Sequence, residues 1–444
     1  MNHTKLSKLW DSLHASYWFL PSVMVAAAIG LALLLLALDG TKQVNFDEWN
    51  WLYTGGPEGA RALLSAIAGS MMTVAATAFS ITIVALQLAS SNFGPRLLRN
   101  FMQDTGNQFV LGTFISTFIY CLLVLRTIRG EDFDFFVPQL SVTVGIVLAI
   151  VSIGVLIYFI HHASTIIQAS HVITEVSQDL TATIDRLFPE KLGHNAPEPT
   201  AWLKQIPPDF ETAACSIPAK HSGYLQAIDN ETLMKIACQH NLLLQIKFRP
   251  GKFMVKGCEL ALVYPGKRVK PQLFDLINNA LILGQERTEQ QDVEFPIDQL
   301  VEIALRAISP GINDPFTAVR CIDRLTDGLC QLAQRDIPSP YRFDREGQLR
   351  VIVEPISFGQ LVDAAFNQIR QYSRSDAAVT IRLLEAISTI AAFTHRPDDR
   401  VALHRHAEMI YQGSREGLPE AQDRNDVEER YLRVIKALKS SEIR

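Results

Sequence analysis

Polar side chains recur at regular intervals along one long apolar segment, residues 63–89, and they are the clearest candidates for chemistry. They are Ser70, Thr73, Thr77, Ser80 and Gln87. Steps of three and four residues, with Val84 filling one gap, place these side chains on a single helix face. Such a face can line a polar conduit between copies of the helix, or it can pack against neighbouring helices that small residues allow to approach closely. Gln87 is the residue that packing explains least well.

A second group of polar residues lies between residues 284 and 323. Arg287 and Asp292 directly precede an apolar helical pattern, and this density of charge predicts a paired network. Asn313 and Asp314 lie in the string SPGINDPFTA, in which Asp314 can cap a helix that has Pro315 at its first position. The string is typical of a rigid turn between helices. Alternatively, Asn313 and Asp314, together with Arg287 and Asp292, form a polar corner at a ligand or subunit contact.

Motifs of the common catalytic sites are absent from the sequence. It contains no P-loop, HExxH, GxSxG or nucleotide-binding GxGxxG string, and its six cysteines form no CxxC pair. An enzyme would require a cleft in which His395, His404 or His406 meets a carboxylate. We therefore expect no catalytic residue, no metal and no cofactor. The net charge of −5 gives no indication of a nucleic-acid partner.

Long uncharged stretches in the first third of the chain supply the elements that carry the polar stripe. Residues 19–38, 63–89, 109–125 and 138–161 are each apolar and long enough to cross about 30 Å of hydrocarbon. The first stretch could instead be a signal peptide, but it is longer than a usual signal core and no A-x-A site follows it. No Asp, Glu, Lys or Arg lies within these stretches, which argues against an ion-coupled pump and leaves passive conduction open.

An even number of spans places both termini on one side of the membrane. Lys5, Lys8, Arg96 and Arg99 then share that side, whereas the opposite loops are mainly acidic but also carry some Lys and Arg. The charge rule alone therefore discriminates weakly. The large C-terminal part and cysteines typical of a reducing compartment favour the cytoplasm. We expect an inner-membrane, multi-pass protein with both termini cytoplasmic.

Beyond the last span the chain changes character several times. A helical pattern predicts an extension of the fourth span over residues 163–188, and its amphipathic stripe needs a partner, so we expect a homo-oligomer. Prolines mark a linker at residues 189–213, strand patterns indicate a small β-rich module at 214–270, and helices dominate 271–444. The predicted fold class is an α-helical membrane protein, with a four-helix transmembrane domain at residues 1–162 and an α+β cytoplasmic domain.

Two resemblances to known families refine these expectations. Residues 249–266 are similar to the hairpins of the biotinyl/lipoyl-like barrel-sandwich fold, but they lack the lysine turn of a cofactor carrier and imply a scaffold module. The strings SITIVALQLASSNFGPR, in the second span, and SPGINDPFTA resemble an uncharacterised bacterial family of predicted membrane proteins, under domain of unknown function 2254. This second resemblance covers nearly the whole chain. It implies a membrane protein and carries over no catalytic or ligand residue.

Two functional hypotheses follow from these patterns. The first is a homo-oligomeric channel-like or transport-related protein, in which the polar stripe lines the path and the cytoplasmic domain regulates or assembles it. The alternative is a membrane-anchored sensor or scaffold whose cytoplasmic domain binds a ligand or partner. An oligomer whose second spans face lipid or only their own bundle would contradict the first hypothesis. A well-formed cytoplasmic pocket with a closed, tightly packed membrane bundle would favour the second. The expected partners are the lipid bilayer, further copies of the chain, and an ion or small molecule.

Overall fold

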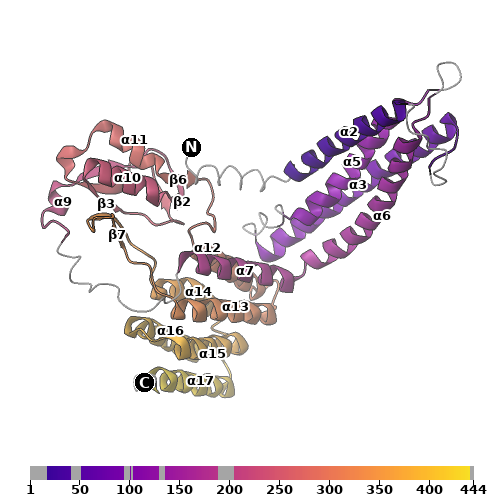
Figure 1. Ribbon diagram of the computed structural model, residues 1–444. Helices are drawn as coiled ribbons and strands as arrows, with labels where there is room; N and C mark the ends of the chain where they lie inside the picture. Colours follow the sequence, from indigo (N-terminus) through magenta and orange to yellow (C-terminus); the bar gives the residue numbers. More distant parts are fainter. Residues whose placement is uncertain are drawn as a thin grey trace. The chain divides into compact units, whose positions relative to one another are not determined.

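The computed structural model describes residues 18–41, 52–94, 101, 104–129, 136–188 and 205–440. The chain divides into two units, Met1–His171 and Val172–Arg444. We name them the N-terminal unit and the C-terminal unit, and each is described by itself (Figure 1).

Four long helices form the N-terminal unit. They are α2 (Phe19–Gly40), α3 (Pro57–Phe93), α5 (Thr105–Leu125) and α6 (Gln139–Ile166). Each is long and apolar enough to cross a membrane, as the sequence predicted. Helix α5 packs against the other three helices. In its most apolar 18-residue segment 56% of the residues are buried, compared with 17 to 28% in the corresponding segments of the other helices. Helix α5 is therefore the centre of the bundle.

A seam of mainly small residues on α3 allows close packing in this bundle. Its buried positions recur every three or four residues and are Ala60, Leu64, Ala68, Met71, Ala75, Ala78, Thr82, Ala85, Ala89 and Phe93. Alanine at most of these positions lets the backbone of α3 approach α5 closely. Gly112 of α5 allows α2 to approach α5 closely, because a Cβ atom at position 112 would lie 3.2 Å from the Cα atom of Pro21 in α2.

Carboxylates tie the helix termini together at both ends of the bundle. Asp39 of α2 accepts hydrogen bonds from the backbone N–H groups of Leu140 and Ser141, at 3.1 and 3.0 Å, and from the Ser141 hydroxyl at 2.6 Å. It therefore caps the first turn of α6, where unpaired N–H groups favour an anion. At the other end Asp104 caps α5, and its Oδ2 atom lies 2.7 Å from Nε2 of His162 in α6. Both contacts join antiparallel helices.

Two sheets and several short helices form a β module in the C-terminal unit. The larger sheet has the order β1-β5-β3-β8-β7. Its strands are β1 (Cys215–Pro218), β5 (Glu259–Tyr264), β3 (Leu243–Ile246), β8 (Leu349–Val353) and β7 (Tyr341–Phe343). The smaller sheet has the order β4-β2-β6, with β4 (Phe253–Met254), β2 (Gly223–Ile228) and β6 (Leu281–Gly284). The helices are α9 (Phe210–Ala213), α10 (Asn230–His240), η3 (Gly266–Arg268) and α11 (Pro271–Asn279).

Segments distant in the sequence complete the larger sheet of the β module. Strand β8 pairs in parallel with β3, with Leu244 opposite Val351, whereas the other ladders are antiparallel. Strands β4 and β5 enter different sheets, so the hairpin expected from the barrel-sandwich similarity does not form. The core of the β module gathers apolar side chains from both sheets and from α10 and α11, among them Leu225, Leu233 and Ile277.

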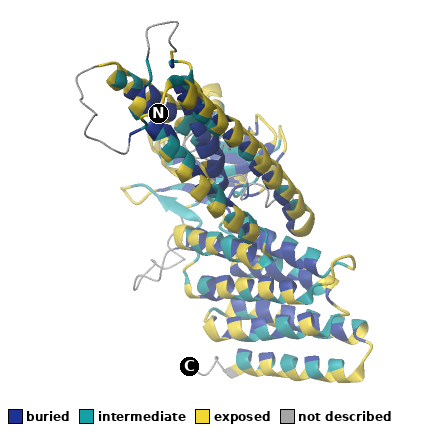
Figure 2. Ribbon diagram, turned by 90° about the vertical axis from the view of Figure 1, so that its right-hand side faces the viewer, coloured by how far each residue is buried: buried dark blue, intermediate teal, exposed yellow. Residues whose placement is uncertain are grey.

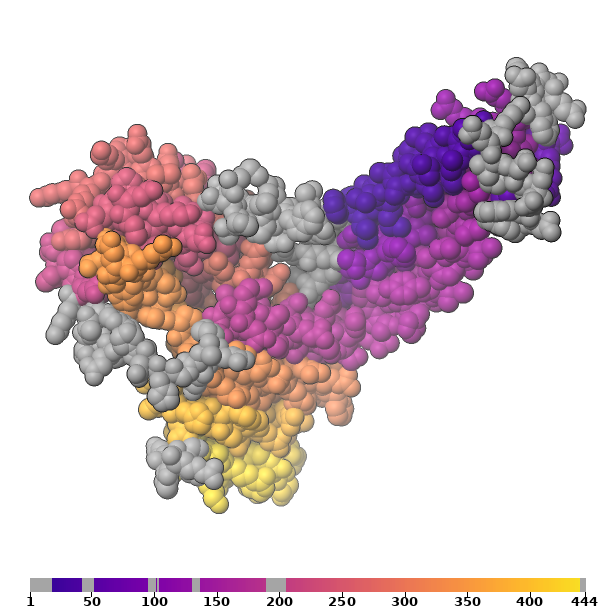
Figure 3. Space-filling model, viewed as in Figure 1, coloured from indigo at the N-terminus to yellow at the C-terminus, as the bar shows by residue number. Residues whose placement is uncertain are grey.

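Three helical hairpins form a stack in the rest of the C-terminal unit. They are α12 (Glu294–Ala307) with α13 (Pro315–Gln334), α14 (Phe358–Tyr372) with α15 (Ala377–Phe393), and α16 (Pro397–Gly417) with α17 (Ala421–Ser440). Helices α12, α14 and α16 form one layer, and α13, α15 and α17 form the other. Figure 2 shows buried faces turned toward neighbouring helices and exposed faces turned outward, and Figure 3 shows the surface that results.

The helices within a layer run in the same direction. Arg382 of α15 pairs with Asp323 of α13 at 2.5 Å, and further along both helices Arg396 donates to the carbonyl of Arg335 at 3.0 Å. Contacts between α14 and α16 are parallel in the same way. The stack therefore has two distinct ends. The turn end carries the turns that join the two helices of each hairpin, and the module end carries the first turns of α12 and α14, beside the β module.

Helix α7 (Ala169–Leu187) lies along the stack and runs parallel to α13. Leu180 of α7 packs on Gly328, and Asp185 pairs with Arg335 at 2.5 Å. It follows that α7 begins at the turn end and ends at the module end. Ile167 and Gln168 interrupt the helical pattern between α6 and α7, where the sequence predicted a continuous extension.

Candidate functional site

The polar stripe of α3 lies outside the helical bundle. Ser70, Thr73, Thr77, Ser80 and Gln87 are all exposed, on the face opposite the small-residue seam. Each of the four hydroxyl groups donates to the backbone carbonyl four residues earlier, at 2.7 to 3.0 Å. These groups are therefore satisfied without water, and the stripe is available to lipid or to another helix.

The polar side chains that α5 and α6 bury inside the bundle were not identified from the sequence. Thr117 of α5 and Ser152 of α6 are both about 1% exposed, and their hydroxyl oxygens lie 3.2 Å apart. Tyr120 of α5 is also buried, and its hydroxyl donates to the carbonyl of Ser141 at 2.8 Å. Single Ser and Thr residues in apolar segments are the signal that could have indicated these contacts. They hold α5 against α6.

The polar corner proposed from sequence is divided between two places. Asn313 and Asp314 lie at the turn end, whereas Arg287 and Asp292 lie at the module end, and the roughly 21 Å length of α12 separates them. Asp314 caps α13 by accepting hydrogen bonds from the backbone N–H and the hydroxyl of Thr317, at 3.1 and 2.6 Å. Asn313 adopts the left-handed conformation with φ 53° and is exposed. The four residues therefore do not form one site.

A buried ion-pair network stands at the module end. Arg287 donates to Oδ2 of Asp292 from Nε and Nη2, at 2.8 and 2.7 Å, and to Asp298 from Nη1 at 2.5 Å. The Asp292 side chain is 3% exposed. Burial raises the pKa of Asp292 to about 6, and the guanidinium group of Arg287 opposes this shift. Oδ1 of Asp292 also accepts a hydrogen bond from the N–H group of Glu294, in the first turn of α12.

The backbone of the β module lies directly against the Asp292 carboxylate of this network. Gly251 has φ +89°, and a Cβ atom there would lie 2.2 Å from Oδ2 of Asp292. Only glycine suits both the backbone angle and the close approach. Next to it, Arg249 donates to Glu294 at 3.2 Å and to Gln360 of α14 at 3.0 Å. The turn of the β module is thereby fastened to the first turns of two stack helices.

A pocket of about 440 Å³ opens at this junction, entirely within the C-terminal unit. Its wall includes the end of α7 (Arg186, Leu187 and Phe188), the residues around Asp292, and residues of β7 and β8 with their flanks. A second hollow of about 490 Å³ shares Arg249 and Glu354 with it. The pocket thus collects side chains from α7, the β module and the stack, which a sequence pattern does not bring together.

Two of the arginines that line the pocket are Arg186 and Arg342. Arg186 donates to the Thr183 hydroxyl at 3.2 Å and to the carbonyl of Glu289, and Arg342 donates to the carbonyls of Ser339 and Tyr341. Among the described residues neither guanidinium group forms a salt bridge. Burial lowers the pKa of Arg342, which indicates that no carboxylate compensates its charge there. Guanidinium groups without a counter-charge are suited to bind a carboxylate or a phosphate.

The histidine that could have indicated an enzyme is closed off from solvent. His406 is fully buried, and its Nε2 atom lies 2.8 Å from Oδ1 of Asp363. Burial lowers the pKa of His406. Within the part of the chain that the structure describes, no group of three or more His, Cys, Asp or Glu residues is arranged to hold a metal ion.

Four apolar helices joined to a C-terminal unit of helices and strands define a polytopic membrane protein. The chain belongs to the family described as Predicted membrane protein (DUF2254), whose model matches residues 14–389, and the resemblance inferred from SPGINDPFTA is confirmed. An uncharacterized protein of Mycobacterium bovis and one of Mycobacterium tuberculosis are each 32% identical to it over 423 residues. These alignments cover 93% of this chain and 79% of each relative. No solved structure matches the chain.

Proposed function

We propose that this protein is an inner-membrane sensor whose C-terminal, cytoplasmic unit binds a small anion and transmits binding to the membrane through α7. The observation that carries this proposal is that α7 begins two residues after α6 and ends in the wall of the pocket. The N-terminal bundle is closed around α5, which also favours the second of the two sequence hypotheses. Both termini lie in the cytoplasm in this proposal, and the accessibility of introduced cysteines to impermeant reagents tests that orientation.

The pocket can act on α7 through its arginines. An anion bound between Arg186 of α7 and Arg342 beside the β module forms charge-assisted hydrogen bonds to both, each contributing about 1.5–3 kcal/mol. A ligand shifts a conformational equilibrium only by the difference in its affinity for the two states. Binding that draws Arg186 inward therefore favours the position of α7 in which both arginines reach the anion. Helix α7 is the segment that connects this change to the last span.

Thermal unfolding of the full-length protein in a neutral detergent tests the ligand class. Phosphate, pyrophosphate and a dicarboxylate are each added to the wild type and to Arg186→Gln, Arg342→Gln and Arg345→Gln. Arg345 is the matched control, because it is exposed on the β7–β8 turn and does not line the pocket. An anion at about 100 times its dissociation constant stabilises the binding state by about 2.7 kcal/mol. We expect one of the anions to stabilise the wild type and Arg345→Gln but not Arg186→Gln or Arg342→Gln. Equal stabilisation of all four proteins would exclude this pocket as the binding site.

A second candidate function rests on the exposed polar face of α3. We propose, as the alternative, a homo-oligomer in which these faces meet and line a conduit for an ion or small solute. Ion flux into liposomes is compared for the wild type, Thr77→Leu, Ser80→Leu and the control Met72→Leu, at an exposed apolar position of the same helix. The conduit is supported if Thr77→Leu and Ser80→Leu both reduce the flux and Met72→Leu does not. A monomer in light scattering, or no flux across ions and voltages, excludes it.

A further inference from the structure

We infer that the turn end of the helical stack is a lipid-facing surface that binds anionic head groups of the membrane. Phe316 and Tyr372 supply its apolar part, and Arg370 and Arg374 supply its charge. This inference does not depend on the ligand of the pocket at the opposite end.

Large apolar side chains project from the turn end. Phe316 is 80% exposed, Tyr372 is 73% exposed and Ile312 is 45% exposed. The turn that carries Ile312 is ordered by its own hydrogen bonds, since the N–H of Asp314 donates to the carbonyl of Ala307 at 2.7 Å and Asp314 caps α13. Phe316 is the second residue of α13 and Tyr372 is the last residue of α14. Aromatic residues are enriched at the membrane–water interface.

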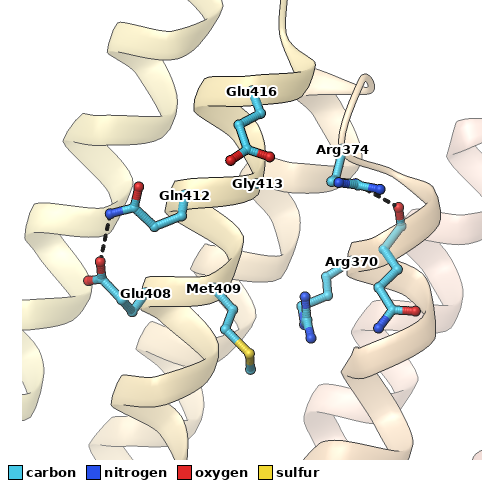
Figure 4. Close-up of a pocket in the computed structure, with 8 residues that line it drawn as sticks. Arg370, Arg374, Glu408, Met409, Gln412, Gly413 and Glu416 are labelled. Carbon is cyan, nitrogen blue, oxygen red and sulfur yellow. Dashed lines mark hydrogen bonds between the residues drawn. The ribbon is translucent and has the colours of Figure 1, made fainter.

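A hollow of about 490 Å³ at the same end presents two arginines (Figure 4). Arg370 donates to the side-chain oxygen of Asn367, at 3.1 and 3.3 Å, and Arg374 donates to the carbonyl of Gln371 at 3.3 Å. Neither guanidinium group has a salt-bridge partner among the described residues. Gly413 of α16 leaves room for Arg374, whose Cδ atom would lie 3.3 Å from a Cβ atom at that position.

Two carboxylates of α16 line the other side of this hollow. Glu408 accepts hydrogen bonds from Gln412 at 2.8 Å and from the Tyr431 hydroxyl at 2.5 Å, so its charge is directed away from the arginines. Glu416 lies beside Arg374 in Figure 4 without a hydrogen bond to it. The arginines thus remain available to a phosphate group that enters from solvent.

Chain connectivity limits the distance between the start of α7 and the last span. Helix α7 begins two residues after α6, and the apolar part of α6 ends at Ile160, so the start of α7 lies near the head-group layer. Leu180 of α7 contacts Gly328 of α13, and the two helices are parallel. Gln168 precedes Leu180 by about twelve residues and Phe316 precedes Gly328 by the same number, which corresponds to about 18 Å along each helix. Within the C-terminal unit the exposed aromatics are therefore level with the start of α7, and only two residues connect that helix to the last span, which favours lipid over a soluble partner as the occupant.

Head-group quenching in vesicles tests this surface on the full-length protein. Phe316→Cys, Tyr372→Cys and Val401→Cys are made in a Cys238→Ser background, because Cys238 is exposed, and are labelled with bimane. Val401 is the matched control, since it is 69% exposed and lies near the start of α16, at the module end. The vesicles contain phosphatidylcholine with a nitroxide on the head group, with or without phosphatidylglycerol.

We expect quenching at positions 316 and 372 to exceed that at 401 by about twofold or more when phosphatidylglycerol is present. Adding Arg370→Gln and Arg374→Gln to the Phe316→Cys protein should remove the part of the quenching that depends on phosphatidylglycerol. Quenching at 316 and 372 no greater than at 401 overturns the inference. A second result also overturns it. If inorganic phosphate stabilises the detergent-solubilised protein and the two arginine substitutions abolish this stabilisation, the hollow binds a soluble anion.

Discussion

Replacing Arg287 by alanine should destabilise the C-terminal unit strongly, because it leaves Asp292 buried without its counter-charge. The Asp292 side chain is 3% exposed and would keep the Glu294 N–H group, at 3.1 Å, as its remaining partner. Removing one member of a buried ion pair costs about 3–5 kcal/mol. For a unit of this size each kcal/mol lowers the melting temperature by roughly 2–4 °C, so we expect a decrease of about 6–20 °C at pH 8.

The pH dependence of this loss follows from the pKa of Asp292. Its pKa in the folded protein is about 6, above the ordinary value of 3.8, so the folded state binds more protons than the unfolded state between these two values. The contribution of Asp292 to stability is therefore fully favourable below about pH 4 and falls as the pH rises through about 6. At pH 5 most Asp292 is neutral and needs no counter-charge. The difference in melting temperature between wild type and Arg287→Ala should accordingly be smaller at pH 5 than at pH 8.

A thiol-reactive dye that becomes fluorescent on reaction measures this unfolding in detergent in a Cys238→Ser background, because Cys238 is exposed and Cys321 is fully buried in the stack. Arg287→Ala with Asp292→Asn removes both charges and should recover much of the loss. Arg306→Ala is the control, since Arg306 meets Glu302 at 3.5 Å in a half-buried i,i+4 pair, of a kind worth about 0.3–0.5 kcal/mol on helix surfaces. A single variant as stable as the wild type at pH 8, or a double variant no better than the single one, would refute this account of the network.

Further substitutions address the Gly251 turn at the module end and the Asp314 cap at the turn end. Gly251→Ala should cost about 2–4 kcal/mol, because it combines a positive φ with a clash against the Asp292 carboxylate, and the same dye assay should show the loss. Gly257→Ala, which also has a positive φ but no atom within 4 Å of its Cβ position, separates the backbone cost from the clash. Asp314→Ala should cost about 1 kcal/mol through loss of the cap on α13, whereas Asp314→Asn should be nearly neutral, and equal effects of both would contradict the capping role.

Local physics made several features predictable from the sequence. A segment that crosses hydrocarbon must satisfy its backbone hydrogen bonds within itself, so apolar stretches such as residues 63–89 identify spans without knowledge of their neighbours. The side-chain spacing of Ser70, Thr73, Thr77 and Ser80 likewise determines that they share one face. The cap at Asp314 depends on Thr317 three residues later and on Pro315 between them, and it forms as the sequence indicates.

The tertiary structure alone decided where these features point. Each hydroxyl of the α3 stripe bonds to its own helix, so its chemistry does not distinguish a buried face from an exposed one, and the alanine seam places the stripe outside. The parallel pairing of β8 with β3 joins segments more than a hundred residues apart, and so does the pocket that Arg186 and Arg342 both line. Such contacts arise from packing between elements and leave no periodic signal in either segment. For that reason the sequence determined the spans and the caps, whereas the pocket at the end of α7 emerged only when the chain was folded.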